Sequence, residues 1–306
     1  MGRVLNFGSL NLDYVYSVDH FVKPGETMSA KSQKINPGGK GLNQSCALAR
    51  AGADVFHAGS VGSGGESLIR ILRENGVDTS YLLQTQELQG NAVIQVDSSG
   101  ENCILLFGGS NRCITEQQVT ETLADFGKGD LLILQNEINQ LPLIVETAYQ
   151  RGMTIVLNPS PYDERLDEVD FGKLSWLLVN EVEAGQIAGT ADPEEAWSRI
   201  HQQYLGLSVL ITLGRQGSIA YRADGNTVMT EKQKAIPVRA VDTTAAGDTY
   251  TGYFVAALME GRPLKECMQL ASIAAAISVT REGAASSVPY RAEVEQAFAQ
   301  HELENR

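Results

Sequence analysis

Residues 131–157 read LLILQNEINQLPLIVETAYQRGMTIVL, which is the pattern of a strand, a helix and a second strand. Leu131–Gln135 is a mostly apolar run of strand length, and Thr154–Leu157 is a second one. Between them, Pro142–Arg151 has the length of a helix, and Gly152 closes it. Apolar strands that alternate with helices are typical of a parallel sheet covered on both faces, so this stretch predicts an α/β fold.

The same alternation continues in both directions along the chain. Strands are predicted at Val4–Phe7, Val55–Ala58, Trp176–Val179 and Val209–Leu213, and helices at Leu42–Arg50, Leu68–Glu74, Gly247–Met259 and Lys265–Val279. Thr115 with Gln118 predicts a capping box, and Asp192 before Pro193 marks another helix start. We therefore expect residues 1–306 to form one domain, a doubly wound, mostly parallel sheet flanked by helices.

Two segments have a different pattern. Asn11–Ser17 and Asn91–Phe107 alternate like half-exposed strands, and the second folds back at Asp97–Gly100. Half-exposed strands do not suit a sheet buried on both faces. We expect them to form a small β-sheet lid from about residues 11–35 and 90–108, although ordinary edge hairpins are the alternative.

Composition limits the classes of partner. The net charge is -13 and the chain has no basic run, which disfavours nucleic acid because phosphate neutralisation supplies most of that affinity. The four cysteines are scattered, so they indicate neither a disulfide framework nor a metal site. No stretch has the length and apolarity of a signal sequence or a membrane span, and we expect a cytoplasmic protein with no membrane partner.

Two glycine-rich clusters suggest sites for ligands. Gly38–Asn43 stands at the start of a helix, where glycines allow close approach and the helix end favours anions or hydroxyl oxygens. Taken alone, this cluster is more typical of a plain turn before a helix. Asp242–Thr249 reads DTTAAGDT, whose small residues leave backbone N–H groups open as a nest for phosphate. Asp248 beside that nest could accept a proton from an attacking hydroxyl, or could simply be a helix-start acid.

Polar residues also follow two predicted strands, where ligands of parallel sheets gather. Asn180–Glu183 comes directly after one strand, and its carboxylates could hold Mg²⁺ or could be helix-start acids. Thr212–Gly217 follows another strand, and its two glycines could admit a nucleotide or form a simple turn. Gly59–Gly65 does not have the spacing of a dinucleotide-binding loop, and we interpret it as a tight connection.

Taken together, these clusters resemble the pfkB, or ribokinase-like, carbohydrate kinase family. Both signature regions of the family are present in order, at Gly38–Gly52 and Asp242–Phe254. Between them lie the Asn-x-x-Glu motif that ends at Glu183 and the TLGxxG turn at Thr212–Gly217. The resemblance runs from about Arg3 to about Pro289, and it implies a fold of the family's type.

The resemblance also implies roles for individual residues. Asp248 would be the catalytic base, with the amides of Ala245, Ala246 and Gly247 stabilising the transferred phosphoryl group. The sugar would be bound by Asn11, Asp13, Gly39, Lys40, Asn43, Glu137 and Asp248. ATP would be bound by Asn180, Thr212, Leu213, Gly214, Arg215, Gln216, Gly217, Gly247 and Ser272.

Two cations and a partner follow from the same resemblance. Mg²⁺ would enter with ATP and be held with help from Glu183. K⁺ or another monovalent cation would bind at Asp242, Thr244, Ser278, Arg281, Gly283 and Ser287. A lid with an open apolar face would suit a homodimer in which two lids cover each other.

The implied activity is ATP-dependent phosphorylation of a sugar's terminal hydroxyl, with D-ribose as the best match. The short segment after Val61, together with Thr244 and Ser272, departs from the family's usual residues. Other acceptors therefore stay open, namely fructose, deoxyribose or a nucleoside. A sugar or nucleotide sensor without turnover and a nicotinamide dehydrogenase are alternatives from other classes.

Overall fold

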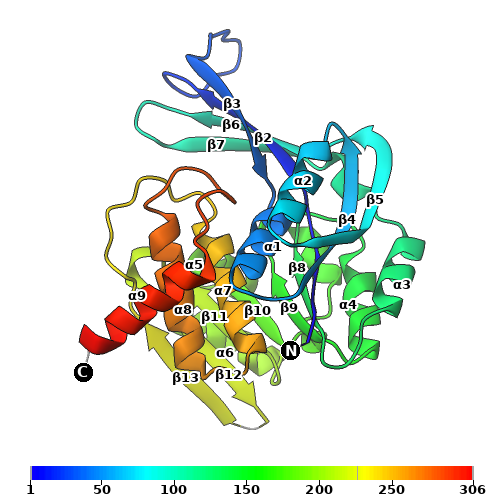
Figure 1. The fold of residues 1–306 in the computed structure, drawn as a ribbon, viewed down its shortest axis with the longest axis vertical. Coiled ribbons are helices and arrows are strands. Elements are labelled where there is room, and N and C mark those ends of the chain that lie inside the picture. The colour runs from blue at the N-terminus through cyan, green and yellow to red at the C-terminus, as the bar shows by residue number, and fades with distance from the viewer. Residues whose placement is uncertain (1, 226, 305–306) are drawn as a thin grey trace.

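The computed structural model describes residues 2–225 and 227–304, and its centre is a nine-stranded sheet (Figure 1). The strand order is β13-β12-β11-β10-β9-β8-β1-β4-β5. The parallel strands are β1 (Val4–Phe7), β4 (Val55–Ser63), β5 (Asp78–Leu88), β8 (Leu131–Gln135), β9 (Thr154–Asn158), β10 (Trp176–Asn180) and β11 (Ser208–Thr212). Two antiparallel strands, β12 (Ser218–Asp224) and β13 (Thr227–Gln233), complete one edge.

Helices cover both faces of this sheet. They are α1 (Lys40–Arg50), α2 (Glu66–Glu74), α3 (Glu116–Ala124), α4 (Leu141–Gln150), α5 (Glu181–Ala188), α6 (Pro193–Gln203), α7 (Ala246–Met259), α8 (Leu264–Ser278) and α9 (Arg291–Glu304). Side chains of β1 alternate between the faces: Val4 joins a core with α1, α7 and α8, whereas Leu5 joins a core with α3 and α4. The predicted doubly wound, mostly parallel sheet is confirmed.

A second, four-stranded sheet projects beyond the main body (Figure 1). Its order is β3-β2-β6-β7, with β2 (Asn11–Ser17), β3 (Ser32–Gly38), β6 (Asn91–Val96) and β7 (Asn102–Phe107). The central pair β2–β6 is parallel and both outer pairs are antiparallel. Every residue of β7 is exposed, so the described part of the chain covers its apolar side chains only in part. We call this sheet the lid.

The structure differs from two local predictions made from the sequence. Residues 59–63 are not a tight connection, because β4 continues through them to Ser63 and pairs there with β5. The capping box at Thr115 is half formed: the hydroxyl accepts from the Gln118 N–H at 3.1 Å. The Gln118 side chain instead donates to the Gly59 carbonyl at 2.7 Å, which draws it into the core and away from the cap.

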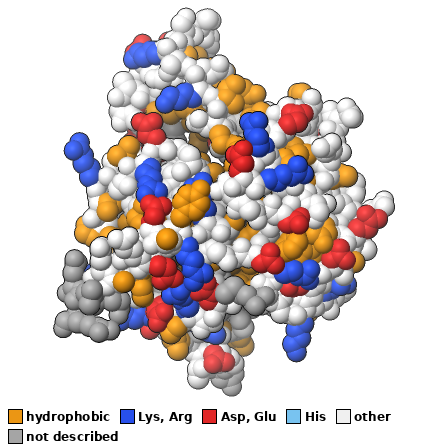
Figure 2. All heavy atoms as spheres, in the orientation of Figure 1, with side chains coloured by type: hydrophobic (Ala, Val, Ile, Leu, Met, Phe, Trp, Pro, Cys, Tyr) orange, Lys and Arg blue, Asp and Glu red, His pale blue; other side chains and the backbone are white. Residues whose placement is uncertain are grey.

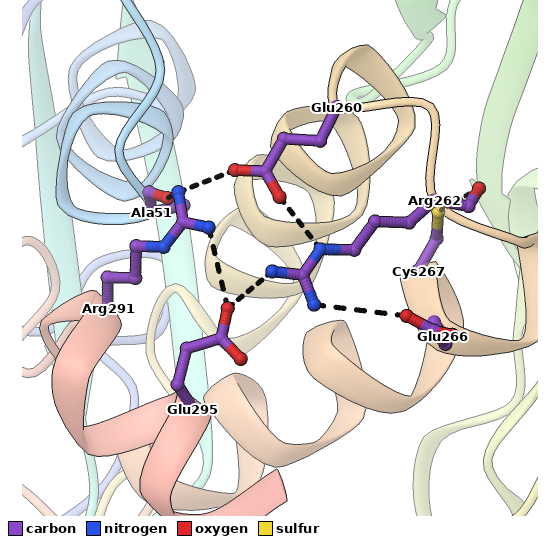
Figure 3. Close-up of polar contacts among 7 residues, drawn as sticks. All are labelled: Ala51, Glu260, Arg262, Glu266, Cys267, Arg291 and Glu295. Carbon is purple, nitrogen blue, oxygen red and sulfur yellow. Dashed lines mark hydrogen bonds and ion pairs between the residues drawn. The ribbon is translucent and has the colours of Figure 1, made fainter.

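A cluster of ion pairs fastens α9 to the main body (Figure 3). Glu260, at the end of α7, accepts from Arg291 of α9 at 2.5 Å and from Arg262 at 2.7 Å. Arg262 in turn bonds Glu295 of α9 at 2.5 Å. Elsewhere the surface is mixed: Figure 2 shows acidic, basic and apolar side chains interspersed on one face. Within the described ranges, no helix is long and apolar enough to cross a bilayer.

Candidate active site

A cavity of about 170 Å³ lies at the carboxyl ends of the central strands. It is lined by Asn158, Asn180 and Thr212, which end or follow β9, β10 and β11, and by the first residues of α1 and α7. This is the edge at which ligands of open α/β sheets bind. The two glycine-rich motifs therefore meet here, since Lys40 comes from the first motif and Asp248 from the second.

Asp248 is held from two sides inside this cavity. It lies in the first turn of α7 and is only 7% exposed. Its Oδ2 accepts a hydrogen bond from Asn43 Nδ2 at 3.0 Å, and its Oδ1 accepts one from Gln44 Nε2 at 2.9 Å. Each carboxylate oxygen has a second lone pair, so the group can still receive a proton. Sequence reasoning assigned Asn43 to the sugar and did not identify Gln44.

The backbone before Asp248 forms the start of α7. Ala245 adopts a left-handed conformation with φ of 57°, a strained choice for a residue with a side chain. The N–H of Ala246 donates to the Thr243 carbonyl at 3.2 Å, so this amide already has a partner. The N–H groups of Gly247 and Asp248 precede any intrahelical acceptor, and a Cβ added at Gly247 would meet nothing within 4 Å. Of the amides in the first turn of α7, those of Gly247 and Asp248 are therefore open to a ligand.

Three carboxylates act electrostatically on the ammonium group of Lys40. Burial alone lowers the pKa of Lys40, but the charges of Asp248, Glu137 and Glu183 outweigh burial and raise it. The lysine therefore stays protonated. Glu137 is fixed by the Ser9 hydroxyl and by the backbone N–H of Lys40, which donates to Oε2 at 3.0 Å.

Asp13 of β2 is affected by the charges of two of these carboxylates, Glu137 and Asp248. Burial, together with the charges of Glu137 and Asp248, raises the pKa of Asp13 to about 7. Asn11 of the same strand is 5% exposed, and its Oδ1 accepts from Asn111 Nδ2 at 2.7 Å. Asn111 lies in the short 3₁₀ helix Gly109–Arg112 and had no signal in the sequence.

A second cavity of about 760 Å³ adjoins the first. Of the residues predicted to bind ATP, it is lined by Thr212, Gly214, Arg215, Gly217, Gly247 and Ser272. Asn180, Leu213 and Gln216 are not in its lining. Asn180 lines the first cavity, and Leu213 packs against the hydrophobic core. Residues 235–240, which sequence reasoning missed, form one wall. Gly247, Ala246, Thr243 and Thr212 line both cavities, so the nest lies where the two meet.

Glu183, the predicted Mg²⁺ ligand, lines the first cavity and is 7% exposed. It also completes a capping box, because its Oε2 accepts from the Asn180 N–H at 3.1 Å and Asn180 Oδ1 accepts from the Glu183 N–H at 2.8 Å. The helix-start interpretation of this motif is confirmed, and the role of Glu183 as a Mg²⁺ ligand stays a prediction. Among the described residues, no group of three or more His, Cys, Asp and Glu side chains could hold a metal ion alone.

The predicted monovalent-cation residues lie on two connected loops. Asp242 accepts from Thr244 N–H at 2.9 Å and from Gly283 N–H at 2.9 Å. Burial raises the pKa of Asp242, but the hydrogen bonds from Thr244 and Gly283 outweigh it, so the net pKa is lowered.

Side chains of the second loop are already engaged. The hydroxyls of Ser278 and Ser287 donate to carbonyls three residues earlier, at 2.9 and 2.8 Å. The Arg281 guanidinium pairs with Glu293, so only its backbone carbonyl could face a cation.

Comparison with known proteins identifies the family. Residues 1–291 match the pfkB family carbohydrate kinases. This chain belongs to that family. It is 38% identical over 296 residues to the ribokinase of Haemophilus influenzae, a match that covers 94% of this chain and 95% of that protein.

Solved structures of the pfkB fold agree closely with this one. The ribokinase of Cryptococcus neoformans var. grubii in complex with ADP superimposes with a TM-score of 0.83 at 33% identity, over 97% of this chain and 100% of that one. The Arabidopsis thaliana ribokinase complexed with ribose and ATP gives 0.83 at 28% identity, over 97% and 98%. The pfkB signatures at Gly38–Gly52 and Asp242–Phe254 are the two segments that supply Lys40 and Asp248 to the first cavity.

Proposed function

We propose that this chain transfers the γ-phosphoryl group of ATP to the terminal hydroxyl of a sugar, and that the sugar is D-ribose. One observation carries the proposal: Asp248 is a clamped carboxylate beside a phosphate nest, at the point where a small polar cavity meets a larger one. The larger cavity suits a nucleotide and the smaller one suits reacting groups. The similarity to ribokinases, including one complexed with ribose and ATP, supports ribose as the acceptor.

In the reaction, the sugar hydroxyl gives its proton to Asp248 as its oxygen bonds to the γ-phosphorus. The bond from that phosphorus to the β-phosphate oxygen breaks, and its electrons leave with ADP. The N–H groups of Gly247 and Asp248 stabilise the negative charge of the transferring group, and the ammonium of Lys40 adds a positive charge nearby.

The remaining polar groups of the site orient the sugar. These groups come from three places in the fold, so they can approach the sugar from separate directions. They lie on β2 (Asn11 and Asp13), at the start of α1 (Gly39, Lys40 and Asn43) and just after β8 (Glu137). Glu137 and Asn11 are themselves held by hydrogen bonds, which fixes the geometry in which they meet a substrate. The lid carries Asn11 and Asp13, so its closure over the sugar would exclude water from the reaction.

The cation ligands available here fit both predicted ions. Carboxylate oxygen is what Mg²⁺ prefers, and Glu183 at the cavity wall would hold it together with the phosphates of ATP and water. Bound Mg²⁺ supplies charge neutralisation for the phosphates. Asp242, the carbonyl of Thr244 and groups from Ser278, Arg281, Gly283 and Ser287 would supply K⁺ with oxygen ligands, which suit this ion.

The lid also offers a surface for a second copy of the chain. Ile104, Leu105, Leu106 and Phe107 of β7 are between 47% and 71% exposed, and β7 is an edge strand of the lid. Exposed apolar edge strands associate readily, so we infer a homodimer in which two lids cover each other.

A substrate panel tests the function. Purified protein is given ATP, Mg²⁺ and K⁺ with ribose, deoxyribose, fructose or a nucleoside, and ADP release and the phosphorylated product are followed. The highest kcat/KM is expected with ribose. A higher kcat/KM with another acceptor would move the assignment to a sibling kinase. Tight ribose binding without turnover would favour a sensor.

A further inference from the structure

A row of buried side-chain amides runs beneath Asp248. It consists of Asn6 on β1, Gln135 on β8, Gln44 on α1 and Asn158 on β9, and the first three have no exposed surface. Gln44 Nε2 bonds both Asp248 Oδ1, at 2.9 Å, and Asn158 Oδ1, at 3.2 Å. We refer to these four residues as the amide row. None of them was predicted to contact sugar or nucleotide.

Hydrogen bonds within the amide row fix which atom of each amide faces its neighbour. Gln135 Nε2 donates to Gln44 Oε1 at 2.7 Å and to Asn6 Oδ1 at 3.1 Å. If the Gln44 amide were reversed, its oxygen would face the Asp248 carboxylate and its nitrogen would face a donor. The donor from Gln135 therefore keeps the Gln44 nitrogen directed at Asp248.

Both ends of the amide row are anchored to the backbone. Asn158 Nδ2 donates to the Leu178 carbonyl at 2.8 Å, which turns its oxygen toward Gln44. At the other end, Asn6 Nδ2 donates to the Gly41 carbonyl at 2.8 Å, which turns its oxygen toward Gln135. Because backbone carbonyls accept only, these anchors leave one orientation for every amide between them.

The chain leaves room for this arrangement at Gly8. A Cβ added there would lie 2.5 Å from Gln135 Oε1 and 2.9 Å from Asn6 Oδ1, closer than real side-chain atoms approach. The amide row therefore depends on a residue without a side chain at the end of β1. Burying polar amides costs free energy unless their hydrogen bonds are made, and it also restricts position 8 to glycine. We therefore infer that these hydrogen bonds have a role in the site.

We propose that Gln44 is a positioning residue for the phosphoryl transfer: it holds the Asp248 carboxylate in the orientation that receives the hydroxyl proton. The inference rests on the function proposed above. Asn43 fixes Oδ2 while Gln44 fixes Oδ1, so rotation of the carboxylate breaks both bonds. Losing Gln44 frees that rotation, and small misplacements of reacting groups reduce rates strongly.

The test compares Gln44→Met with the parent enzyme and with Gln118→Met. Gln118 is another buried glutamine, and its amide donates to the carbonyls of Gly59 and Tyr81 rather than to Asp248. Methionine keeps the length of the side chain and removes the donor. We expect kcat for ribose to fall roughly 10- to 100-fold in Gln44→Met. The KM for ATP should stay close to that of the parent, and Gln118→Met should keep its kcat. A folded Gln44→Met protein with the parent's kcat would overturn the proposal.

A double variant separates positioning from general damage. In an Asp248→Asn background, Gln44→Met should lower the residual rate no further, because both changes remove one function. An equal, independent loss in that background would overturn the proposal.

Gln135→Met provides a second arm if Gln44→Met does not fold, since it releases the side-chain oxygens of Gln44 and Asn6 and leaves the Gln44 donor in place. A smaller drop in kcat is expected, and an unchanged kcat counts against the positioning role. If the parent itself forms no ADP with any sugar, the proposed function fails. An active parent with unaffected variants refutes the positioning role alone.

Discussion

Asn43 Nδ2 donates to Asp248 Oδ2 across 3.0 Å, although the two residues are 205 positions apart in the chain. The first belongs to the glycine-rich start of α1 and the second to the phosphate nest at the start of α7. The helices themselves are in contact, because Gly252 of α7 packs directly against Ala47 of α1. The two glycine-rich motifs are therefore joined by the packing of α1 against α7.

Replacement of the proposed base is the most direct prediction. Asp248→Asn removes the proton acceptor. It also places the new amide nitrogen against the amide donor of either Asn43 or Gln44. We expect kcat for ribose to fall by about 10²- to 10⁴-fold, the usual contribution of general acid–base catalysis. Steady-state ADP release measures kcat, and calorimetry with a nonhydrolysable ATP analogue should show nearly unchanged affinity. Asp54→Asn, an exposed change before β4, is the control. A loss under about tenfold would contradict the assignment.

The contact between α1 and α7 gives a second prediction. A Cβ at Gly252 would lie 2.4 Å from Ala47 Cβ and 2.9 Å from the Leu48 nitrogen, so Gly252→Ala must push the helices apart. The clash should outweigh alanine's better helix propensity and destabilise the protein by about 1–3 kcal/mol. Because Asn43 and Asp248 move with these helices, kcat should fall as well.

Gly206→Ala is the matched control for that change, since a Cβ there would meet nothing within 4 Å. Urea denaturation and steady-state kinetics are run on both variants. If Gly252→Ala has the stability and kcat of Gly206→Ala, the close packing of α1 against α7 is not needed for catalysis.

Asp13 gives a pH-dependent prediction for stability. Its folded pKa is raised to about 7 from 3.8, mainly by burial and also by Glu137 and Asp248. The folded state therefore binds more protons than the unfolded state between these values, and this group lowers the free energy of unfolding as pH rises. Asp13→Asn removes that penalty. The variant should resemble the parent in stability near pH 4 and become the more stable protein above pH 7.

Urea denaturation of both proteins across this pH range measures the difference. A stability difference that is the same at pH 4 and pH 8 would show that burial of the Asp13 charge is not costly. The experiment uses protein without sugar, because a bound hydroxyl would change the environment of the carboxylate.

Much of the architecture was readable from the sequence. The runs at Leu131–Gln135 and Thr154–Leu157 are β8 and β9, because apolar strands buried on both faces leave a continuous signal. The edge strand β5 was missed, since Asp78–Leu88 mixes polar and apolar residues without strict alternation. β12 and β13 were missed as well, and they lie at the opposite edge.

For the candidate site, the sequence motifs predicted which residues line the cavity, but they did not predict the hydrogen bonds that hold these residues in place. Asp248 and Lys40 were identified from short glycine-rich patterns, and both line the same cavity. The residues that hold them in place could not be recognised from the sequence. Gln135 and Gln44 are 91 positions apart, and they form a hydrogen bond only because β8 and α1 pack together. Hydrogen bonds of that kind depend on sheet register and helix packing, which local periodicity does not encode.

The exposed strand β7 predicts how the chain assembles. Leu105 is 71% exposed in the middle of an apolar row, and a charge there would be buried unpaired between two lids. Leu105→Glu should convert the proposed homodimer to a monomer, as measured by light scattering during gel filtration. Leu205→Glu, a 67% exposed leucine after α6, should leave the dimer intact. A parent protein that is already monomeric would refute the assembly.

The ion cluster at α9 gives the last prediction (Figure 3). Arg291→Met removes a partner of Glu260, whose side chain is only 14% exposed, and also a donor to the Ala51 carbonyl. Arg262 still pairs Glu260, so we expect a loss of about 1–2 kcal/mol rather than the 3–5 of a fully orphaned buried charge. Arg70→Met, which breaks a pair exposed on both sides, should cost at most about 1 kcal/mol. Urea denaturation gives both values, and equal losses in the two variants would mean that the cluster does not fasten α9.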